Sequence, residues 1–539
     1  MEIKGKLVDI IRREIYPAVI NINGGKIQSI GRSDHANESY ILPGLIDSHI
    51  HIESSMLNPG SFARAAVSRG TTAVVSDPHE IANVLGIQGV DYMMEDASKV
   101  PLRFYFGAPS CVPATSFESS GAIIDSEGVR ELLERPSVSY LSEMMNFPGV
   151  VHDDDEVLKK ISFAKKMRKQ VDGHAPGLRG EALEKYISAG ISTDHECNTI
   201  EEAREKIRLG MKILIREGSA ARNLDALKDL FRTDPDKLML CSDDLHPEML
   251  VKGHIDRLLA LLITEGYDVF DVIRSCTLNP SVHYGIAAGL PQAGNPADLI
   301  LVDDLRSMKV SQTWIEGIKV FDNGRVLFEY SGTGGINNFK SSKIKKDDIR
   351  IRAGSARLRV IEAYDGDLTT GESINPVTIG EEICADIRSD ILKIVVKDRY
   401  RDLKPATAFI RGFGLTSGAF ASSVAHDSHN IIGLGTNDDD ILDAINILIE
   451  NKGGLAAAKN KNIEFLPLPI AGIMSDQPAE LVASEYERLS ELVKSYGCTM
   501  SAPFMTLSFM ALLVIPQLKI SDRGLFDVRK FGFTDLFLD

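Results

Sequence analysis

The stretch LIDSHIHIE, residues 45–53, is an apolar run that carries two histidines, and the interpretation of the fold starts from it. Side chains alternate across a β-strand, so the i, i+2 spacing of His49 and His51 points both imidazoles to one side. In a barrel strand that side is the barrel axis, where two imidazoles can share a divalent metal. One such pair is weak by itself, because an isolated pair of histidines is by default a surface or core feature.

Downstream of this stretch, short apolar runs alternate with helical stretches up to about residue 250. The seven further strand candidates are TAVVSDP, FYFGAP, SYLSEMM, VDGHAP, ISTDHE, KILIREG and KLMLCSDD. Eight strands separated by helices are the count of a (β/α)8 barrel. We therefore expect an α/β fold in which residues 41–290 form this barrel.

The segments on either side of the barrel predict two further domains. Residues 3–31 alternate apolar and polar groups around Asn23-Gly24-Gly25, and VFDNGRVLFEY repeats this pattern after the barrel with Asn-Gly at its turn. We expect these strands to join in one small β domain, made of residues 1–40 and 291–335. Residues 350–539 are expected to form a C-terminal α+β domain. The polar stretch FKSSKIKKDDIRIR before it is interpreted as a solvated linker rather than an anion-binding patch.

Composition and charge limit the classes of partner. The 539 residues include 60 Lys and Arg against 76 Asp and Glu, and the net charge of −16 opposes binding to nucleic acid or to an anionic membrane surface. The six cysteines form no CxxC pair, which favours reduced thiols. The most apolar window, Phe504 to Ile515, is too short to span a bilayer, and the N-terminus has no cleavage site for export. We expect a cytoplasmic protein with a small-molecule substrate.

Four more candidate metal ligands stand at the ends of later strand candidates. They are Glu143 in YLSEMM, His174 in VDGHAP, His195 in STDHE and Asp243 in LMLCSDD. The C-terminal ends of barrel strands face the mouth where barrel active sites are built. Together with the two histidines of the first strand, these groups are too many for one tetrahedral ion with an open position. Two divalent ions bridged by a carboxylate and a solvent species are the natural fit.

At this point the chain resembles the amidohydrolase superfamily, and within it the adenine deaminases. The motifs that carry the resemblance are PGLIDSHIHIESSM, SDPHEIANVLG, SEMMNFPGV, GHAPGL, STDHE and CSDDLHP, and the layout is similar over nearly the whole chain. DPHEIANV and SEMMNFPGV are not needed in a generic metal barrel, so they separate this family from dihydroorotases and hydantoinases. Glu143 stands where the commonest two-metal members place a carboxylated lysine.

The resemblance implies hydrolytic deamination of adenine to hypoxanthine and ammonia in purine salvage, with manganese or iron as the metals. A metal-bridging hydroxide would attack C6, and Asp243 is the expected acceptor of its proton. A second acid is needed for N1 and the leaving amine, and His79 and Glu80 in SDPHE are the candidates. The alternative for this pair is structural, as a helix cap or as groups that orient a metal ligand. Such enzymes are usually homo-oligomers.

Two further positions are interpreted as substrate-binding residues. Asp244 resembles the second aspartate of related purine deaminases and would accept a hydrogen bond from a ring N–H, although a solvated turn carboxylate is the alternative. Glu53 follows the HxH pair and either lines the pocket or caps a helix. In the C-terminal region, AHDSHN contains His426, Asp427 and His429, and we favour a hydrogen-bonded loop over a further metal site. The sequence leaves open whether this loop reaches over the barrel mouth.

Other functions fit the sequence less well. Another amidohydrolase activity, on a cyclic amide or a different aminopurine, would use the same metal hydroxide. A catalytically silent scaffold of this fold is expected to have lost ligands, whereas all six positions are filled here. A zinc deaminase of the cytidine type is excluded, because HxE followed by PCxxC is absent from the sequence.

Overall fold

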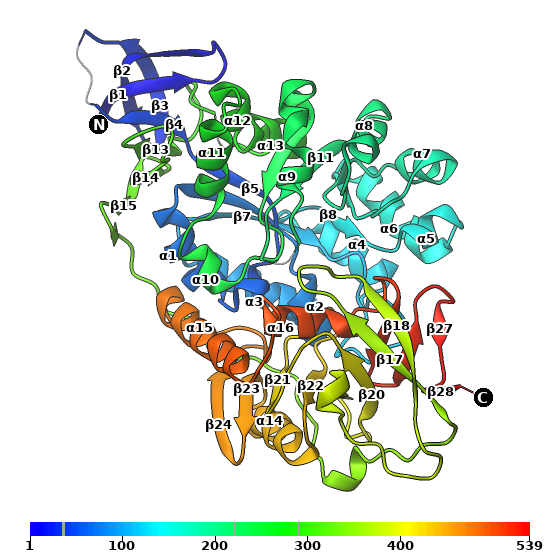
Figure 1. Ribbon diagram of the computed structural model, residues 1–539. Coiled ribbons are helices and arrows are strands. Elements are labelled where there is room, and N and C mark those ends of the chain that lie inside the picture. The colour runs from blue at the N-terminus through cyan, green and yellow to red at the C-terminus, as the bar shows by residue number, and fades with distance from the viewer. Residues whose placement is uncertain (35–37, 220, 289, 539) are drawn as a thin grey trace.

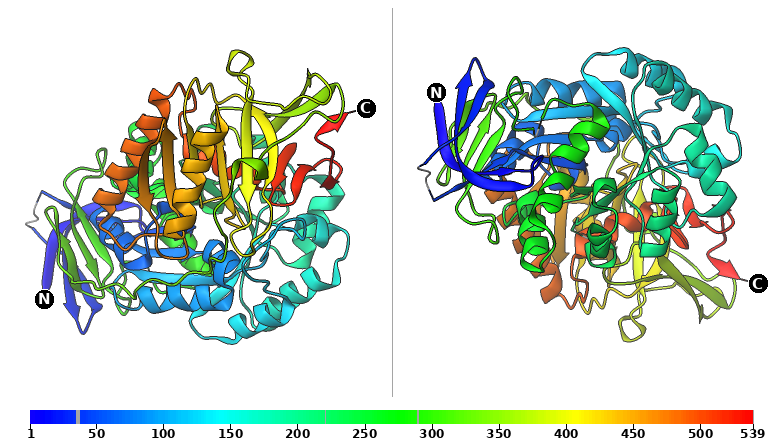
Figure 2. Two further views of the ribbon diagram at one scale, coloured as in Figure 1. Left: turned by 90° about the horizontal axis from the view of Figure 1, so that it is seen from below. Right: turned by 90° about the horizontal axis from the view of Figure 1, so that it is seen from above.

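The computed structural model describes residues 1–34, 38–219, 221–288 and 290–538. A barrel with a small β-sheet at one end lies against a C-terminal body built on a large mixed sheet (Figure 1). Views from below and from above show that the small sheet and the C-terminal body lie on different sides of the barrel (Figure 2).

Eight parallel strands form the barrel, as the alternation of apolar runs and helical stretches predicts. Strands β5 to β9 pair in sequence order, and so do β10 to β12. The circle closes where Ile50 bridges Asp243, with the Asp243 N–H donating to the His49 carbonyl at 3.0 Å. The strands are β5 (Leu45–Ile50), β6 (Thr71–Ser76), β7 (Arg103–Ala108), β8 (Val138–Met144), β9 (Val171–Gly173), β10 (Thr193–Asp194), β11 (Lys212–Arg216) and β12 (Leu238–Cys241).

Helices lie between successive barrel strands and after the last one, and several begin at a capping side chain. Asp125, Asp154 and Thr199 each accept a backbone N–H in the first turn of the helix that follows, which satisfies donors that have no partner within the helix. The helices are α1 (Pro59–Ser68), α2 (His79–Leu85), α3 (Ile87–Ala97), α4 (Ser126–Glu134), α5 (Phe147–Val151), α6 (Asp155–Lys166), α7 (Gly180–Ala189), α8 (Ile200–Arg208), α9 (Leu224–Leu227), α10 (Pro247–Leu250), α11 (Ile255–Thr264), α12 (Val269–Ser275) and α13 (Leu278–Tyr284).

The strands before and after the barrel join in one sheet of order β16-β15-β14-β13-β4-β1-β2-β3, which confirms the flanking β domain of the expected fold. The first and last parts of the chain meet where β13 pairs antiparallel with β4. The hairpin from β15 to β16 turns at Asn323 and Gly324, as Asn-Gly predicts. The strands are β1 (Glu2–Asp9), β2 (Glu14–Asn23), β3 (Lys26–Arg32), β4 (Tyr40–Pro43), β13 (Leu299–Val302), β14 (Val310–Ile315), β15 (Ile318–Asp322) and β16 (Arg325–Val326).

The C-terminal body is built on a sheet of order β18-β17-β20-β19-β22-β21-β23-β24, with β28 also paired to β17. A second sheet holds β25, β26 and β27. The strands are β17 (Arg357–Ala363), β18 (Thr370–Pro376), β19 (Leu392–Lys397), β20 (Ala406–Arg411), β21 (Ala419–Ser422), β22 (Ile431–Gly435), β23 (Gly454–Lys459), β24 (Asn462–Pro467), β25 (Leu518–Ser521), β26 (Gly524–Asp527), β27 (Gly532–Phe533) and β28 (Phe537–Leu538). The helices are α14 (Asp438–Asn451), α15 (Ala479–Ser495) and α16 (Pro503–Ser508).

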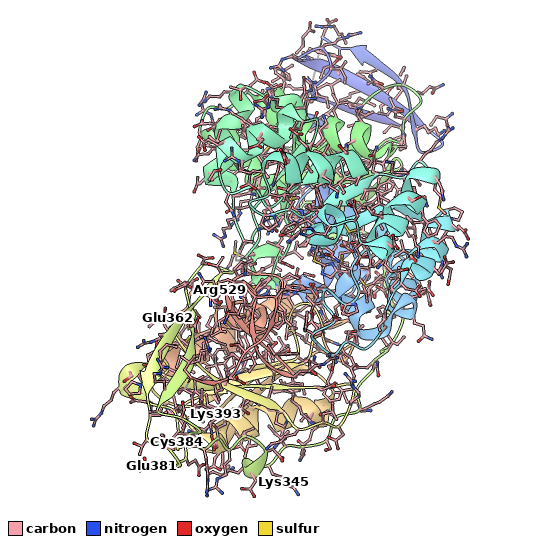
Figure 3. The ribbon with its side chains drawn as sticks, turned by 90° about the vertical axis from the view of Figure 1, so that its right-hand side faces the viewer. Lys345, Glu362, Glu381, Cys384, Lys393 and Arg529 are labelled. Atoms are coloured by element: carbon pink, nitrogen blue, oxygen red, sulfur yellow. The ribbon has the colours of Figure 1, made fainter. Side chains whose placement is uncertain are left out.

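The polar stretch before the C-terminal body lies along its outer side. Lys346 forms an ion pair with Asp439 at 3.3 Å, and Lys343 forms one with Glu450, so this stretch is tied to α14. Lys345 and the exposed Cys384 lie at the end of the body that is farthest from the barrel (Figure 3). The other five cysteines are buried free thiols.

The barrel and the C-terminal body share a hydrophobic core. One cluster of buried side chains includes Ile50 and Phe62 from the barrel together with Ile394 and Phe420 from the large sheet. The backbone of Asn58 donates to the Ser475 carbonyl at 3.0 Å across the same boundary. Because this boundary is packed and hydrogen-bonded, loops of the C-terminal body are held beside the barrel mouth. Within the described residues, no helix is long and apolar enough to cross a membrane.

Candidate active site

Six buried or nearly buried side chains converge at the barrel mouth from the ends of five strand units. Each stands at the end of a strand candidate in the sequence, and the structure brings all of them together. Glu143 lies in the middle of the group, at the second-last position of β8. The six are His49, His51, Glu143, His174, His195 and Asp243.

The two carboxylate oxygens of Glu143 face different histidines. Oε1 lies 3.2 Å from His51 Nε2 and 3.9 Å from His49 Nε2. Oε2 lies 2.9 Å from His174 Nδ1 and 3.2 Å from His195 Nε2. One carboxylate therefore divides the imidazoles into two pairs, which is the arrangement needed to bridge two neighbouring cations.

Asp243 joins the pair on the Oε1 side. Its Oδ1 lies 3.3 Å from His51 Nε2 and 3.4 Å from His49 Nε2. Its backbone has φ of 57°, in the left-handed region that non-glycine residues seldom adopt. Such backbone is retained where surrounding structure fixes it, and here the bridge to Ile50 does so.

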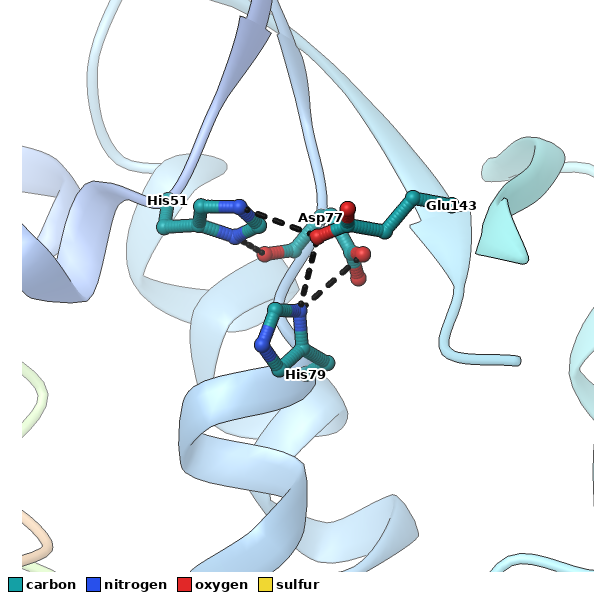
Figure 4. A group of neighbouring side chains, drawn as sticks. All are labelled: His51, Asp77, His79 and Glu143. Carbon is teal, nitrogen blue, oxygen red and sulfur yellow. Dashed lines mark hydrogen bonds and ion pairs between the residues drawn. The ribbon is translucent and has the colours of Figure 1, made fainter. Parts of the chain in front are cut away.

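The histidines present lone pairs that suit a metal. His51 Nδ1 lies 3.1 Å from the carbonyl oxygen of Asp77, so this nitrogen carries the hydrogen and Nε2 is left as an acceptor facing Glu143 (Figure 4). His49 is fully buried, yet neither of its ring nitrogens has a hydrogen-bond partner. Buried polar atoms are nearly always satisfied, so the Nε2 atom of His49, which faces Glu143 and Asp243, is suited to bind a cation. Imidazole and carboxylate donors in this number fit a divalent metal centre, as the family match below also supports.

Sequence reasoning missed Arg216, which ends β11 at the same rim. Its Nη1 donates to Asp243 Oδ2 at 2.6 Å, and its Nη2 donates to Glu196 Oε2 at 2.8 Å. Burial by itself would raise the pKa of Asp243, but Arg216 and the histidines outweigh it and hold that pKa well below its ordinary value. Arg216 also stands near the end of a strand candidate, KILIREG. Because arginine is not a metal ligand, a search for metal ligands at strand ends does not select it.

His79 and Glu80 open helix α2, directly after β6. His79 Nδ1 lies 3.1 Å from Asp77 Oδ2 and 3.6 Å from Glu143 Oε1 (Figure 4). Neither side chain caps α2, where the N-cap is Pro78. Both instead line the cavity at the ligand cluster.

The two predicted substrate-binding residues lie in different surroundings. Asp244 lines the cavity and its Oδ1 accepts a hydrogen bond from the Ser54 hydroxyl at 2.5 Å. Glu53 does not reach this cavity, and its Oε1 accepts the Ile81 N–H at 3.2 Å in the first turn of α2. Burial raises the pKa of Glu53 to about 7. Its surroundings match the helix-capping alternative given from the sequence.

The cavity at the cluster has a volume of about 40 Å³ and is closed on one side by the C-terminal body. His426 and Asp427 line it, so the AHDSHN loop does reach the barrel mouth. A second cavity of about 490 Å³ adjoins the first, and the two share His174 and Arg216 in their walls. The apolar side chains that the C-terminal body adds to the smaller cavity are Leu368, Phe509, Leu512 and Ile515.

Comparison with known proteins agrees with both parts of this site. The amidohydrolase family model matches residues 40–320, and the model of the adenine deaminase C-terminal domain matches residues 367–532. The chain is 51% identical to an adenine deaminase of Methanosarcina mazei, with 99% of each chain covered. It is also 51% identical to an adenine deaminase of Salinibacter ruber, over 100% of this chain and 99% of that one. A solved β-aspartyl dipeptidase of Fervidobacterium islandicum has a TM-score of 0.48 at 16% identity, covering 61% of this chain and 99% of that one.

Proposed function

The chain belongs to the adenine deaminases of the amidohydrolase superfamily, and from this premise we propose that it hydrolyses adenine to hypoxanthine and ammonia at the six-residue cluster. The observation that carries the proposal is the central carboxylate of Glu143, whose two oxygens face separate pairs of imidazoles. A match to the amidohydrolase family alone would be compatible with many substrates. Here the match to adenine deaminases also includes the C-terminal body that closes the cavity.

The side chains that would hold two divalent cations are His49, His51, Glu143, His174, His195 and Asp243. When bound, such cations lower the pKa of water and so supply a nucleophile near neutral pH. We propose manganese or iron, the metals that the family resemblance implies. Imidazole and carboxylate donors accept several first-row ions, so the choice among them depends on availability as well as on the ligands. Metal analysis of the purified protein tests this identity.

The chain's own residues would then move the protons. Asp243 stands beside the cluster with one oxygen toward His49 and His51, so it is placed to accept the proton of the attacking water. Arg216 holds its other oxygen, which fixes the direction from which the carboxylate acts. When water adds at C6, N1 must gain a proton, and the amino group must gain one to leave as ammonia.

His79 and Glu80 line the same cavity and are the proposed route for those protons. Burial alone would raise the pKa of Glu80, but His426, His429 and His79 around it hold that pKa well below its ordinary value, so Glu80 would take up a proton before passing it on. Asp244 is the proposed acceptor for a ring N–H of the base. A carboxylate in this place favours a purine that carries hydrogen on that ring nitrogen, because an ionised carboxylate can only accept hydrogen bonds. Apolar side chains of the C-terminal body would pack on the flat ring and exclude bulk water. Glu53 is proposed to influence the substrate only indirectly, because its carboxylate accepts the Ile81 N–H and so holds the first turn of α2.

Ammonia release is the decisive assay. The purified protein loaded with manganese is expected to release ammonia from adenine and to form hypoxanthine, with adenosine and guanine tested in parallel. Ring opening of hydantoin or dihydroorotate without deamination of adenine would reject the proposal in favour of cyclic amide hydrolysis. We also propose a homo-oligomer, which sedimentation of the same preparation tests.

A further inference from the structure

We propose that His426 and His429 of the C-terminal body are positioning residues that hold Glu80 in its working orientation. This inference rests on the proposed function, because it assigns Glu80 a role in proton transfer. It makes the active site composite, since the barrel alone would leave this carboxylate without its two partners.

The imidazoles of His426 and His429, together called the histidine clamp, each contact a different oxygen of the Glu80 carboxylate. His426 Nδ1 lies 2.6 Å from Glu80 Oε1, and His429 Nε2 pairs with Glu80 Oε2. All three side chains are at most 3% exposed, and His426 is 346 residues away from Glu80 in sequence. The His426 hydrogen bond to this carboxylate is charge-assisted, whereas His429 Nε2 and Glu80 Oε2 are in close contact without an aligned hydrogen bond.

The hydrogen positions on His429 follow from its other contact. The backbone N–H of Ala425 donates to His429 Nδ1 at 3.3 Å, so that nitrogen acts as an acceptor. The ring hydrogen of the neutral form is therefore on Nε2, which faces Glu80. His426 is fixed differently, because its ring stacks on Phe509 with centroids 4.5 Å apart and planes 19° apart.

The loop that carries both histidines is itself anchored on two sides. Asn430 donates to the Ser119 carbonyl of the barrel at 2.7 Å, and its side-chain oxygen accepts the Arg399 N–H at 3.1 Å. The Tyr400 hydroxyl donates to the Ser428 carbonyl at 2.5 Å. His429 has φ of 54°, which costs backbone energy for a non-glycine residue and is retained only because these contacts fix the loop.

This anchoring has a consequence for catalysis. A free glutamate in the first turn of a helix samples several rotamers, whereas Glu80 has both oxygens held while its side chain lines the reaction cavity. Misplacement of a reacting group by about 1 Å can cost on the order of a hundredfold in rate. We therefore expect loss of the clamp to lower kcat with little change in KM.

The two histidines use different ring nitrogens, which gives a matched set of variants. A glutamine places its amide nitrogen near the position of Nε2, and an asparagine places its own near Nδ1. H429Q and H426N therefore keep a donor toward Glu80, whereas H429N and H426Q move it away. The corresponding substitutions at His152, an exposed residue after α5, control for the loss of an imidazole.

We expect kcat for adenine to be at least about tenfold lower in H429N than in H429Q, and at least about tenfold lower in H426Q than in H426N. In an E80Q background the same swaps are expected to change kcat by less than about twofold, because a positioning residue acts only through its partner. Equal losses in both members of a pair, or an undiminished loss in the E80Q background, would overturn the proposal.

Two further readouts separate this proposal from its rivals. His79, Glu80 and Asp427 could instead form a third cation site, in which case H429N or H426Q would lower the metal content measured on the intact protein. Unchanged metal content supports the clamp. If the wild type releases no ammonia from adenine, the proposed function fails, and the clamp is then judged from unfolding: E80Q and H429N must show non-additive losses of stability, and additive losses reject it.

Discussion

The barrel rim and the C-terminal body build one cavity in opposite ways. The rim contributes charged and imidazole side chains from strand ends, where each position is fixed by the hydrogen-bonded strands beneath it. The C-terminal body contributes a mainly apolar wall together with the two imidazoles that hold Glu80. In the proposed mechanism, the first region supplies the groups that react or bind cations, and the second encloses and orients them.

This division predicts different consequences for substitutions in the two regions. Loss of a rim group removes chemistry, so rates should fall by orders of magnitude while the fold is retained. Loss of a contact in the C-terminal body should instead alter orientation, substrate affinity or stability by smaller amounts. Substitutions in both regions test this contrast, and those of Glu143, Arg216 and Lys519 have controls at exposed sites.

D243N is expected to have the largest effect. Asparagine keeps the shape of the side chain but cannot accept the proton of the attacking water, so kcat should fall by about 10²–10⁴-fold, the usual contribution of a general base. Metal content should stay close to that of the wild type. Turnover within a few-fold of the wild type, measured by ammonia release, would reject Asp243 as the base and weaken the contrast between the regions.

E143Q is expected to act through the cations. A neutral amide offers one oxygen where the carboxylate offers two, so metal content should fall below the about two ions per chain of a bridged centre, and activity should fall with it. Elemental analysis after gel filtration measures the occupancy. E134Q, at an exposed position on α4, should retain full metal content. Full occupancy in E143Q would contradict the bridging role.

The convergence of the rim residues could be predicted because it depends on local rules. The i, i+2 spacing of His49 and His51 and the strand-end positions of Glu143 and Asp243 are set by strand geometry, and the order of parallel strands then brings them together. Their roles as ligands remain predictions. The contact of His426 with Glu80 depends on how two bodies dock across 346 residues, which no local pattern records.

The partners of some capping and ion-pairing side chains also could not be predicted from the sequence. Glu53 could either line the pocket or cap a helix, and only the distance of 3.2 Å to the Ile81 N–H distinguishes these. Arg216 could have been found from its strand-end position, but its partner Glu196 lies on a different strand unit, directly after His195. Tertiary contacts of this type are decided by side-chain rotamers rather than by spacing.

R216K should have an intermediate effect and sharpen the description of the rim. The guanidinium reaches Asp243 and Glu196 at once, whereas an ammonium cannot reproduce this planar fork. We expect kcat to fall by about tenfold to a hundredfold, as for a modest misplacement of the base. R232K, at an exposed position, should behave as the wild type. An unchanged kcat in R216K would show that Asp243 needs no such support.

K519M should have the smallest effect on turnover and a measurable effect on stability. Lys519 is fully buried in β25 and donates to the Leu368 and Phe509 carbonyls at 2.7 and 3.0 Å, which ties together two segments of the cavity wall. Burial lowers the pKa of Lys519 to about 7. Methionine leaves both carbonyls without this donor, so K519M should be destabilised at high pH, where the wild-type amine is neutral.

The pH dependence of this effect has a definite sign. Between about pH 7 and the ordinary lysine pKa of about 10.4, the unfolded chain binds one more proton at Lys519 than the folded chain does, so this residue makes the free energy of unfolding rise with pH. K519M lacks this slope, and its melting temperature relative to the wild type should therefore be higher at pH 6 than at pH 9. K530M, at an exposed position, should show no such difference. A constant offset at both pH values would mean that Lys519 stays protonated in the fold, and the wall would then be held by a permanent cation.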